Sequence, residues 1–398
     1  MKKIYLDNAA TTPIDKKVIS SMKKYWRDDF ANPSSIHSMG VKAKKTLDSS
    51  REKVSRFLNA HSREIYFTSS GTESNNLAIL GVAKKAKEFF PRPHLITTEI
   101  EHSSILECFK ELSDDGFDVD YLKVDEDGLV NAKDVRNLIK DETVLISIGY
   151  ANSEIGVIQP VKDIIKEIRY KRKEFNRGKV GYPYLHIDAS QATQYLNMNV
   201  EELGVDLVTL DAQKIYGPKG IGALFVRDGI KLDSIIFGGG QERGLRGGTE
   251  NLPLIVGFTK ALEIVNKNKD KKLERLLKLR DWFFNEIKKE IPEIVINGSI
   301  KKRLPNNINI SMIGFDGEML VLRLDEVGII CSSSSACASG AGESVIVKKI
   351  SEKKEDNIEN IQKRAKSTLR FSMSNDTKKR HLKKVLKYLL KIRDNYKG

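Results

Sequence analysis

Short apolar runs alternate with longer amphipathic stretches over the first two thirds of the chain. The runs are rich in β-branched and aromatic residues and end in polar or glycine-containing loops, a pattern that predicts buried strands. Stretches in which apolar residues recur three or four positions apart predict helices between them. The predicted strands cover residues 4–6, 65–68, 94–98, 144–149, 184–187, 207–210 and 221–226, and the helices include 41–58, 77–86 and one that Pro13 opens. This alternation up to about residue 255 predicts an α/β fold with a mainly parallel sheet covered by helices.

The pattern changes after residue 255 to long charged helices, each with one apolar stripe. Such stripes are typical of core packing. A chain of 398 residues is also longer than one hydrophobic core usually serves. We therefore expect a large domain over 1–255 and a smaller C-terminal α+β domain over 256–398, with the first fifteen or so residues packing on the second. The stripes are Leu273, Leu276, Leu277, Phe283, Phe284 and Ile287, and then Leu382, Val385, Leu386, Leu389 and Ile392.

The net charge of +14 comes mostly from lysines scattered over the predicted helices, which is typical of a solvated surface. No basic motif with interleaved aromatic residues is present, which argues against nucleic acid as a direct partner. Three cysteines are too few and too unevenly spaced for a disulfide framework. The N-terminus lacks an apolar signal region, and no apolar stretch approaches the roughly 18 residues of a membrane span. We expect a cytoplasmic protein that does not contact a membrane.

One lysine stands where a ligand would bind. Lys214 follows the apolar strand 207–210 and precedes a glycine-containing turn. In an open α/β sheet, ligands bind outside the carboxyl ends of the strands. A desolvated lysine there can attack an aldehyde and form a Schiff base, and pyridoxal phosphate is the commonest such aldehyde. Taken alone, Lys214 could equally be one more solvated lysine.

Polar residues at the ends of neighbouring strands favour the cofactor site. Asp188 could keep the pyridine nitrogen of pyridoxal phosphate protonated, although an aspartate there could also cap a helix. Gln191 and Asn152 are candidate donors to the phenolic oxygen of the ring. His102 could stack on the ring and carry protons, although a lone histidine is more often structural.

Two glycine-containing loops are candidates for the phosphate. The stretch 69–76 joins a strand to a helix, and free N–H groups at a helix start attract anions. Gly71 and Thr72 would contribute there, although small residues at helix starts also serve as ordinary caps. The second stretch, 237–249, lets backbone approach an anion closely, and Thr249 or its arginines could complete the site.

Two further features lie in the C-terminal part. Residues 331–342 form a run of small residues that contains Cys331 and Cys337. We expect it to be mobile, either as a plain connector or as an arm that carries a thiolate between a cleft and an outside acceptor. Arg370, in a short strand, could hold a substrate carboxylate or form a structural ion pair.

Together these stretches resemble the group I cysteine desulfurases of the NifS/IscS type, in the class V aminotransferase superfamily. The resemblance covers nearly the whole chain and implies a homodimeric fold-type I enzyme that uses pyridoxal phosphate and no metal. It implies conversion of L-cysteine to L-alanine, with the sulfur held as a persulfide on Cys337 and passed to an iron–sulfur scaffold or a tRNA-thiolation protein. The motifs, in family order, are YLDNAATTP, ANPSSIH, FTSSGTESNNLAI, EHSSIL, NSEIGVIQP, IDASQ, KIYGPKGIG, GGGQERGLRGGTEN, SSSSACAS and LRFS.

The resemblance also implies a role for each matching residue. Cys108 and Cys331 are expected to be packed as small apolar residues. Catalysis would involve His102, Cys337 and Lys214, and Lys214 would also bind the cofactor. The implied binding residues are Asp188 at the pyridine nitrogen, Gln191 and Asn152 at the ring oxygen, Gly71 and Thr72 at the phosphate, Thr249 at the phosphate of the partner subunit, and Asn32 and Arg370 at the substrate.

One departure concerns the residues before the lysine. The family usually has Ser-Gly-His-Lys or Ser-Ala-His-Lys, whose serine and histidine bind the cofactor phosphate, whereas this chain has Asp211-Ala212-Gln213-Lys214. Gln213 keeps an N–H donor. Asp211 would repel a phosphate dianion if it pointed the same way.

Two alternatives remain at this point. Another fold-type I pyridoxal phosphate enzyme, such as a selenocysteine lyase or an aminotransferase, shares the lysine and the aspartate but needs no thiol on a loop. A non-catalytic binding protein with a decayed cofactor site is the other alternative, and it is favoured by Asp211 and Gln213.

Overall fold

The computed structural model describes residues 3–177, 181–267, 269–333, 342–354 and 357–396. Its larger sheet has the strand order β2-β8-β7-β6-β5-β3-β4. Strands β4, β3, β5, β6 and β7 are parallel, whereas β8 runs antiparallel to both β7 and β2. The predicted mainly parallel sheet is thus confirmed. The strands are β2 (Ile65–Thr68), β3 (His94–Thr98), β4 (Asp118–Leu122), β5 (Thr143–Gly149), β6 (Tyr184–Asp188), β7 (Leu207–Asp211) and β8 (Gly222–Val226).

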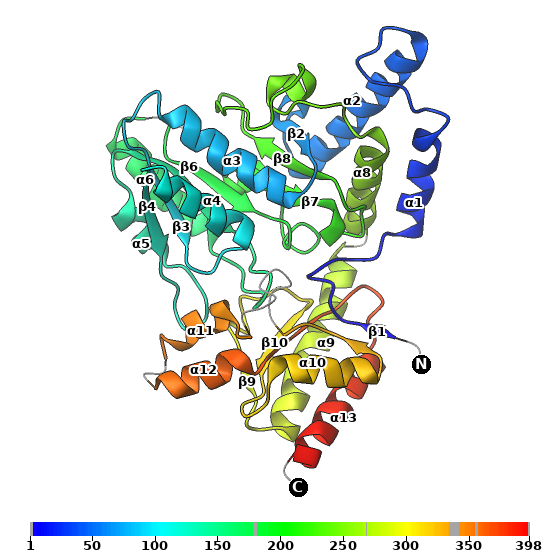
Figure 1. Cartoon of the computed structure of the whole chain (residues 1–398), viewed down its shortest axis with the longest axis vertical. Coiled ribbons are helices and arrows are strands. Elements are labelled where there is room, and N and C mark those ends of the chain that lie inside the picture. Colours follow the sequence, from blue (N-terminus) through cyan, green and yellow to red (C-terminus); the bar gives the residue numbers. More distant parts are fainter. Residues whose placement is uncertain (1–2, 178–180, 268, 334–341, 355–356, 397–398) are drawn as a thin grey trace.

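Helices cover both faces of this sheet (Figure 1). Adjacent strand residues such as Leu145 and Ile146 belong to two different buried clusters, because successive side chains in a strand point to opposite faces. One cluster contains α3 and α4, and the other contains α2, α6 and α8. The helices are α1 (Lys16–Met22), α2 (Ser38–Leu58), α3 (Gly71–Ala86), α4 (Ser103–Asp114), α5 (Ala132–Leu138), α6 (Val161–Glu174), α7 (Val200–Leu203) and α8 (Leu252–Asn266), with 3-10 turns η1 (Lys23–Trp26), η2 (Ser62–Glu64), η3 (Ala212–Lys214) and η4 (Gln241–Gly244).

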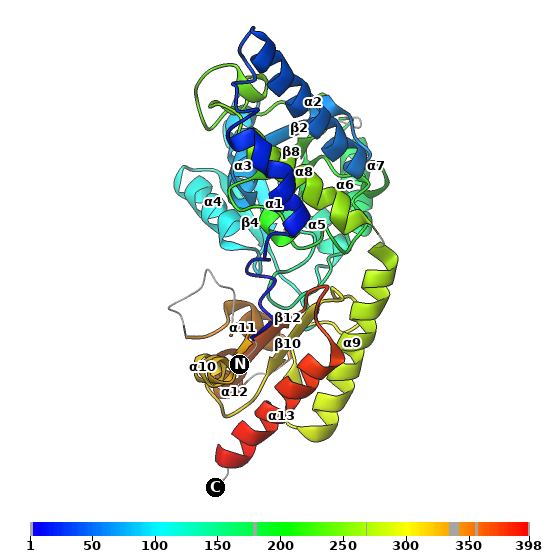
Figure 2. The ribbon, with the colours of Figure 1, turned by 90° about the vertical axis from the view of Figure 1, so that its right-hand side faces the viewer.

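A smaller sheet forms the other part of the molecule, in the lower half of Figure 1. Its central strand β10 (Asn307–Ser311) pairs antiparallel with β9 (Val295–Ile296) and β12 (Thr368–Ser372). The long helix α9 and the last helix α13 lie along this part (Figure 2). The helices of this part are α9 (Lys269–Glu290), α10 (Gly317–Glu326), α11 (Val345–Ser351), α12 (Ile358–Lys366) and α13 (Lys379–Tyr396).

The first described residues of the chain connect the two parts. Strand β1 (Ile4–Tyr5) pairs parallel with β11 (Ile329–Ile330) of the smaller part, whereas the N–H groups of Thr12 and Asp15 donate to carbonyl oxygens of the larger part. Helix α8, which crosses the predicted domain boundary at residue 255, packs against α1 and α2 of the larger part. Pro13 does not open α1: the helix begins at Lys16, because the Asp15 side chain accepts a hydrogen bond from the Lys17 N–H and caps it.

Among the described helices, none combines the length and the apolar character that a membrane span needs.

Candidate active site

A cavity of about 320 Å³ opens at the carboxyl ends of β5, β6 and β7, where the strand-end rule places ligands. Its wall also includes the start of α3, the segment before α4, the N-terminal segment and β12. The structure therefore brings together residues from seven separate parts of the chain. The predicted site residues on this wall are Gly71, Thr72, His102, Asn152, Asp188, Gln191, Asp211, Gln213, Lys214 and Arg370.

Three other predicted residues stand apart. Asn32 and Thr249 are exposed and do not line the cavity of this single chain. The Asn32 side chain instead accepts a hydrogen bond from the Ser34 N–H, at 2.8 Å. Cys337 falls within 334–341, outside the described residues.

Lys214 ends the short turn η3 and is held by the N-terminal segment. Its Nζ donates to the carbonyl oxygens of Ala9 and Ala10, at 2.9 and 2.6 Å. The Gln191 amide donates to the same Ala9 carbonyl, at 2.9 Å. Sequence reasoning missed the two alanines, because they contribute backbone carbonyls and no side-chain chemistry. The stretch YLDNAATTP, which carries them, was the available signal.

Asp188 is fixed by donors on two elements. Its Oδ2 accepts from the Asn75 amide at 2.8 Å, and its Oδ1 accepts from the Ser190 N–H at 2.9 Å. The same Asn75 amide nitrogen donates to Ser104 Oγ, at 2.9 Å. These donors fix the orientation of the Asp188 carboxyl group on the cavity wall, where it could face a pyridine nitrogen. Asn75 is a further site residue that sequence reasoning missed.

His102 caps α4 through its ring. Its Nδ1 accepts a hydrogen bond from the Ser104 N–H at 3.1 Å, so the neutral ring carries its proton on Nε2. Burial has the largest effect on the pKa of His102 and lowers it. The negative charge of Asp188 acts in the opposite direction and raises this pKa. The imidazole is therefore neutral near pH 7.

Glu101 lies on the cavity wall, buried beside His102, and sequence reasoning missed it. Its Oε2 accepts from the Gly149 N–H at 2.8 Å, and its Oε1 accepts from the Thr98 hydroxyl at 2.7 Å. Burial, the largest cause, together with the negative charge of Asp188, raises the pKa of Glu101 to about 7, although the hydrogen bonds from Gly149 and Thr98 lower it. The carboxyl is thus poised to titrate near neutrality.

This raised pKa predicts a pH-dependent stability difference between the wild type and Glu101→Gln. A carboxyl group whose pKa is higher in the folded than in the unfolded chain stabilises the folded chain. This stabilisation is complete when the pH is below the unfolded pKa, and it is lost as the pH rises through the folded pKa. Between pH 4.5 and 7 the wild type should lose about 2 to 3 kcal/mol relative to the glutamine variant. Urea unfolding of the cofactor-free chains at pH 5 and pH 8 measures this. The exposed Glu111→Gln on α4 is the control, and parallel pH profiles for the wild type and Glu101→Gln would contradict the prediction.

The start of α3 lies on the cavity wall at Gly71. A Cβ on Gly71 would lie 3.0 Å from Ser190 Oγ and 3.2 Å from Asp211 Oδ2, so a side chain there would crowd both groups. The N–H groups of the first helical turn and the helix dipole attract a phosphate there. Asp211 is buried at the same place. Its Oδ1 and Oδ2 accept hydrogen bonds from the backbone and side-chain nitrogens of Gln213, at 3.1 and 3.2 Å.

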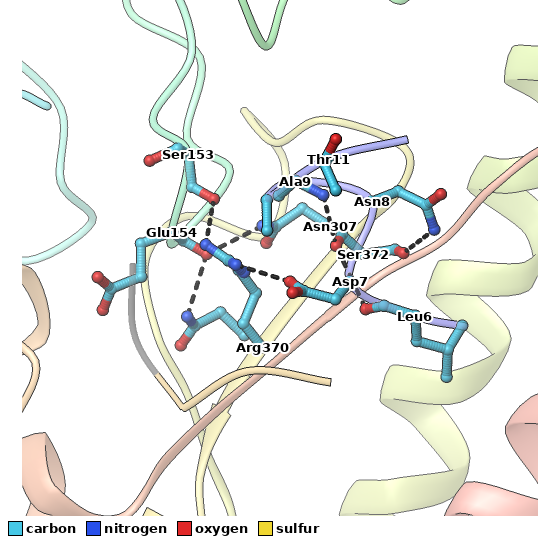
Figure 3. A network of polar contacts seen from close by, with 12 residues as sticks. Leu6, Asp7, Asn8, Ala9, Thr11, Ser153, Glu154, Asn307, Arg370 and Ser372 are labelled. Atoms are coloured by element: carbon cyan, nitrogen blue, oxygen red, sulfur yellow. Dashed lines mark hydrogen bonds and ion pairs between the residues drawn. The ribbon is translucent and has the colours of Figure 1, made fainter. Parts of the chain in front are cut away.

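Arg370 is both ion-paired and part of the cavity wall (Figure 3). Its Nη2 donates to Asp7 Oδ1 at 2.8 Å, and its Nη1 donates to the Ser153 carbonyl at 3.2 Å. Among the described residues, its buried Nε has no hydrogen-bond partner. The ion pair fixes the guanidinium plane and leaves a donor available. Asp7 was not predicted, although it lies in the stretch YLDNAATTP.

Cys108 and Cys331 are buried, as predicted. Burial is the main cause that raises the pKa of each thiol to about 12. A reactive cysteine needs a thiolate at neutral pH. These two thiols therefore remain protonated at neutral pH.

The cavity residues fit pyridoxal phosphate at three points: an amine on Lys214, a fixed carboxylate on Asp188, and an open helix start at Gly71. The buried Asn75 Oδ1, which has no hydrogen-bond partner among the described residues, marks a polar wall that a ligand can still satisfy. Asp211, beside that helix start, carries a charge that would oppose a phosphate.

Comparisons with known proteins agree with this geometry. Residues 4–385 match the model of the family described as aminotransferase class-V. Cysteine desulfurase IscS of Dictyoglomus turgidum is 43% identical over 344 residues, which cover 85% of this chain and 83% of that relative. A solved NifS-like protein has a TM-score of 0.88 at 32% identity and covers 98% of this chain and 99% of its own. The solved SspA in complex with cysteine has a TM-score of 0.76 at 34% identity, over 94% of this chain and 99% of its own.

The family match spans nearly all of the chain, and the structural match confirms the predicted fold-type I architecture. The chain therefore belongs to the class V aminotransferases and, among them, to the pyridoxal phosphate-dependent cysteine desulfurases of the IscS and NifS type.

Proposed function

We propose that this protein removes sulfur from L-cysteine, releases L-alanine and holds the sulfur as a persulfide on Cys337. The observation that carries the proposal is that Lys214, Asp188 and Arg370 line one cavity. An amine, a fixed carboxylate and an arginine are the groups needed to act on a bound amino acid. The solved complex of SspA with cysteine supports the substrate.

Each residue has a distinct part in this proposal. Pyridoxal phosphate, when bound, supplies the electron sink for the substrate carbon that loses its proton. Arg370 binds the substrate carboxylate through donors that Asp7 keeps oriented. Lys214 holds the cofactor, and its Nζ can take the Cα proton once the substrate amine is bound. Asp188, held by Asn75, keeps a proton on the pyridine nitrogen. His102, on the cavity wall, would stack on the ring in its neutral form.

The thiol step needs a nucleophile from outside the described residues. The Cys337 thiolate attacks the substrate sulfur and forms the S–S bond of the persulfide, while the Cβ–S bond of the substrate breaks. The electron pair of that bond stays with Cβ, which takes up a proton and becomes the methyl group of alanine. The buried thiols of Cys108 and Cys331 are unsuited to this step, because burial raises the pKa of each to about 12.

We also infer a cytoplasmic homodimer. Asn32 and Thr249, absent from the cavity of their own chain, would then contribute to the cavity of the partner. Exposed apolar side chains beside both residues support this, since Ile36 is 98% exposed and Phe237 is 77% exposed. An iron–sulfur scaffold or a tRNA-thiolation protein would receive the sulfur.

The reaction is tested directly with purified protein, pyridoxal phosphate, L-cysteine and a thiol reductant. Alanine and sulfide should appear in equal amounts. L-selenocysteine, and separately a 2-oxo acid with an amino donor, are offered in parallel. Turnover of selenocysteine with none of cysteine would favour a selenocysteine lyase, and amino transfer without sulfide would favour an aminotransferase. A protein that never acquires the visible absorbance of lysine-bound cofactor would instead be a binding protein with a decayed site.

A further inference from the structure

The carboxyl group of Asp211 is buried at the place where a phosphate would bind. Strand β7 ends at this residue, and the side chain lies against the first residue of α3. Its Oδ2 would be only 3.2 Å from a Cβ on Gly71. The helix start attracts an anion to the same space. A carboxylate and a phosphate would thus meet with little water between them.

The surrounding charges only partly offset this conflict. Lys214 is the cation that acts on Asp211, and Asp188 on β6 adds a second negative charge. On α4, His102 is neutral near pH 7, because burial lowers its pKa. On α3, Glu73 is paired with Arg246 at 2.8 Å, and on β8 the residue opposite Asp211 is the uncharged Gly222. Burial is the largest cause that raises the pKa of Asp211.

A proton removes the conflict and turns a repulsive group into a donor. Gln213 donates to both carboxyl oxygens and keeps the group oriented, yet each oxygen has a second lone pair. A protonated carboxyl beside the helix start would add an O–H donor to the N–H donors of α3. A hydrogen bond between a carboxylic acid and a phosphate oxygen is charge-assisted and strong.

We propose that Asp211 takes up one proton from solvent when the cofactor binds and donates its O–H to a phosphate oxygen. Asp211 is then a positioning residue that couples cofactor binding to proton binding. The proposal rests on the cofactor dependence of the family and does not require cysteine desulfuration. It would therefore survive if the protein acted on another substrate.

This coupling has a definite pH dependence. A bound dianion raises the pKa of the Asp211 carboxyl above its value in the cofactor-free chain. Affinity for the phosphate should be constant below the cofactor-free pKa and should fall as pH rises above it. It should level off above the pKa of the bound state. Between the two values the dissociation constant rises by up to about tenfold per pH unit.

Calorimetry with pyridoxine 5′-phosphate tests the proposal on the full-length chain after removal of the cofactor. This probe has the phosphate and the ring but no aldehyde, so Lys214 cannot react with it. Titrations at pH 8 in buffers of different ionisation enthalpy count the protons taken up on binding. The wild type should take up about one more proton than Asp211→Asn. The variant should also bind the probe about tenfold more tightly at pH 8, with the advantage vanishing at lower pH.

Asp163→Asn on α6 is the matched control, since it removes the same charge from an exposed position, and it should behave as the wild type. Asp211→Ser is a second variant, and circular dichroism checks that both remain folded. If either folded variant takes up as many protons as the wild type, the proposal is wrong. Should neither fold, the infrared difference spectrum of the wild type decides. A carboxylic acid C=O band that appears on adding the probe supports the proposal, and its absence overturns it.

Discussion

Lys214→Ala is expected to abolish both sulfide release and the visible absorbance of the bound cofactor. Among the described residues, Lys214 is the one lysine that lines the cavity, so no other amine is placed to form the covalent link. Loss of a group that acts as nucleophile and as proton carrier should lower the rate by about three orders of magnitude or more. The absorbance spectrum and borohydride reduction followed by peptide mass analysis test for the bound cofactor, and a sulfide assay measures the activity.

The matched control is Lys219→Ala, which removes an exposed lysine from the same stretch KIYGPKGIG and should change none of these readouts. An alanine variant at 214 that still gave a borohydride-reducible link to pyridoxal phosphate would refute the assignment of this lysine.

Cys337→Ser is expected to separate cofactor chemistry from sulfur transfer. The visible spectrum of the holoenzyme should be unchanged and should still respond to L-cysteine, because Lys214, Asp188 and Arg370 remain. Release of alanine and sulfide should fall by about two to three orders of magnitude, since a serine hydroxyl is not ionised at neutral pH and is a poor nucleophile toward sulfur. Spectral titration and product assays are made on the same preparation.

Cys331→Ser and Cys108→Ser are the controls, and both should stay close to wild-type activity. Burial raises the pKa of both thiols to about 12, so neither supplies a thiolate. Loss of activity in Cys331→Ser with none in Cys337→Ser would mean that the other thiol carries the sulfur. Full activity in all three variants would exclude a persulfide on this protein.

The fold was largely predictable because most of its strands are short apolar runs that can be recognised in the sequence. Residues 144–149 are apolar on both sides, and the structure buries Leu145 and Ile146 against helices on opposite faces. Strand β4 was missed for the converse reason. Its sequence Asp118–Leu122 alternates acidic and apolar residues, because it lies at the edge of the sheet and is only partly buried.

Most of the cavity was also predictable, because a strand end followed by a polar residue is a local feature. Asp188 and Lys214 follow adjacent strands, and parallel strands bring such residues to one edge. Asn32 came from the resemblance alone, whereas Thr249 was also suggested by the glycine-containing stretch 237–249. Both remain proposals that depend on a second chain.

Most strands and helices of the larger sheet, the residues at their ends and the family motifs could be recognised in the sequence, since each depends on neighbouring residues. Which groups meet depends on the packing of distant segments. Arg370 pairs with Asp7 across 363 residues, and Lys214 is held by carbonyls more than 200 residues away. The direction of the Asp211 carboxyl depends on how β7 packs against the start of α3. No local pattern encodes such contacts, because they arise when the packing of distant segments fixes the distance between their atoms.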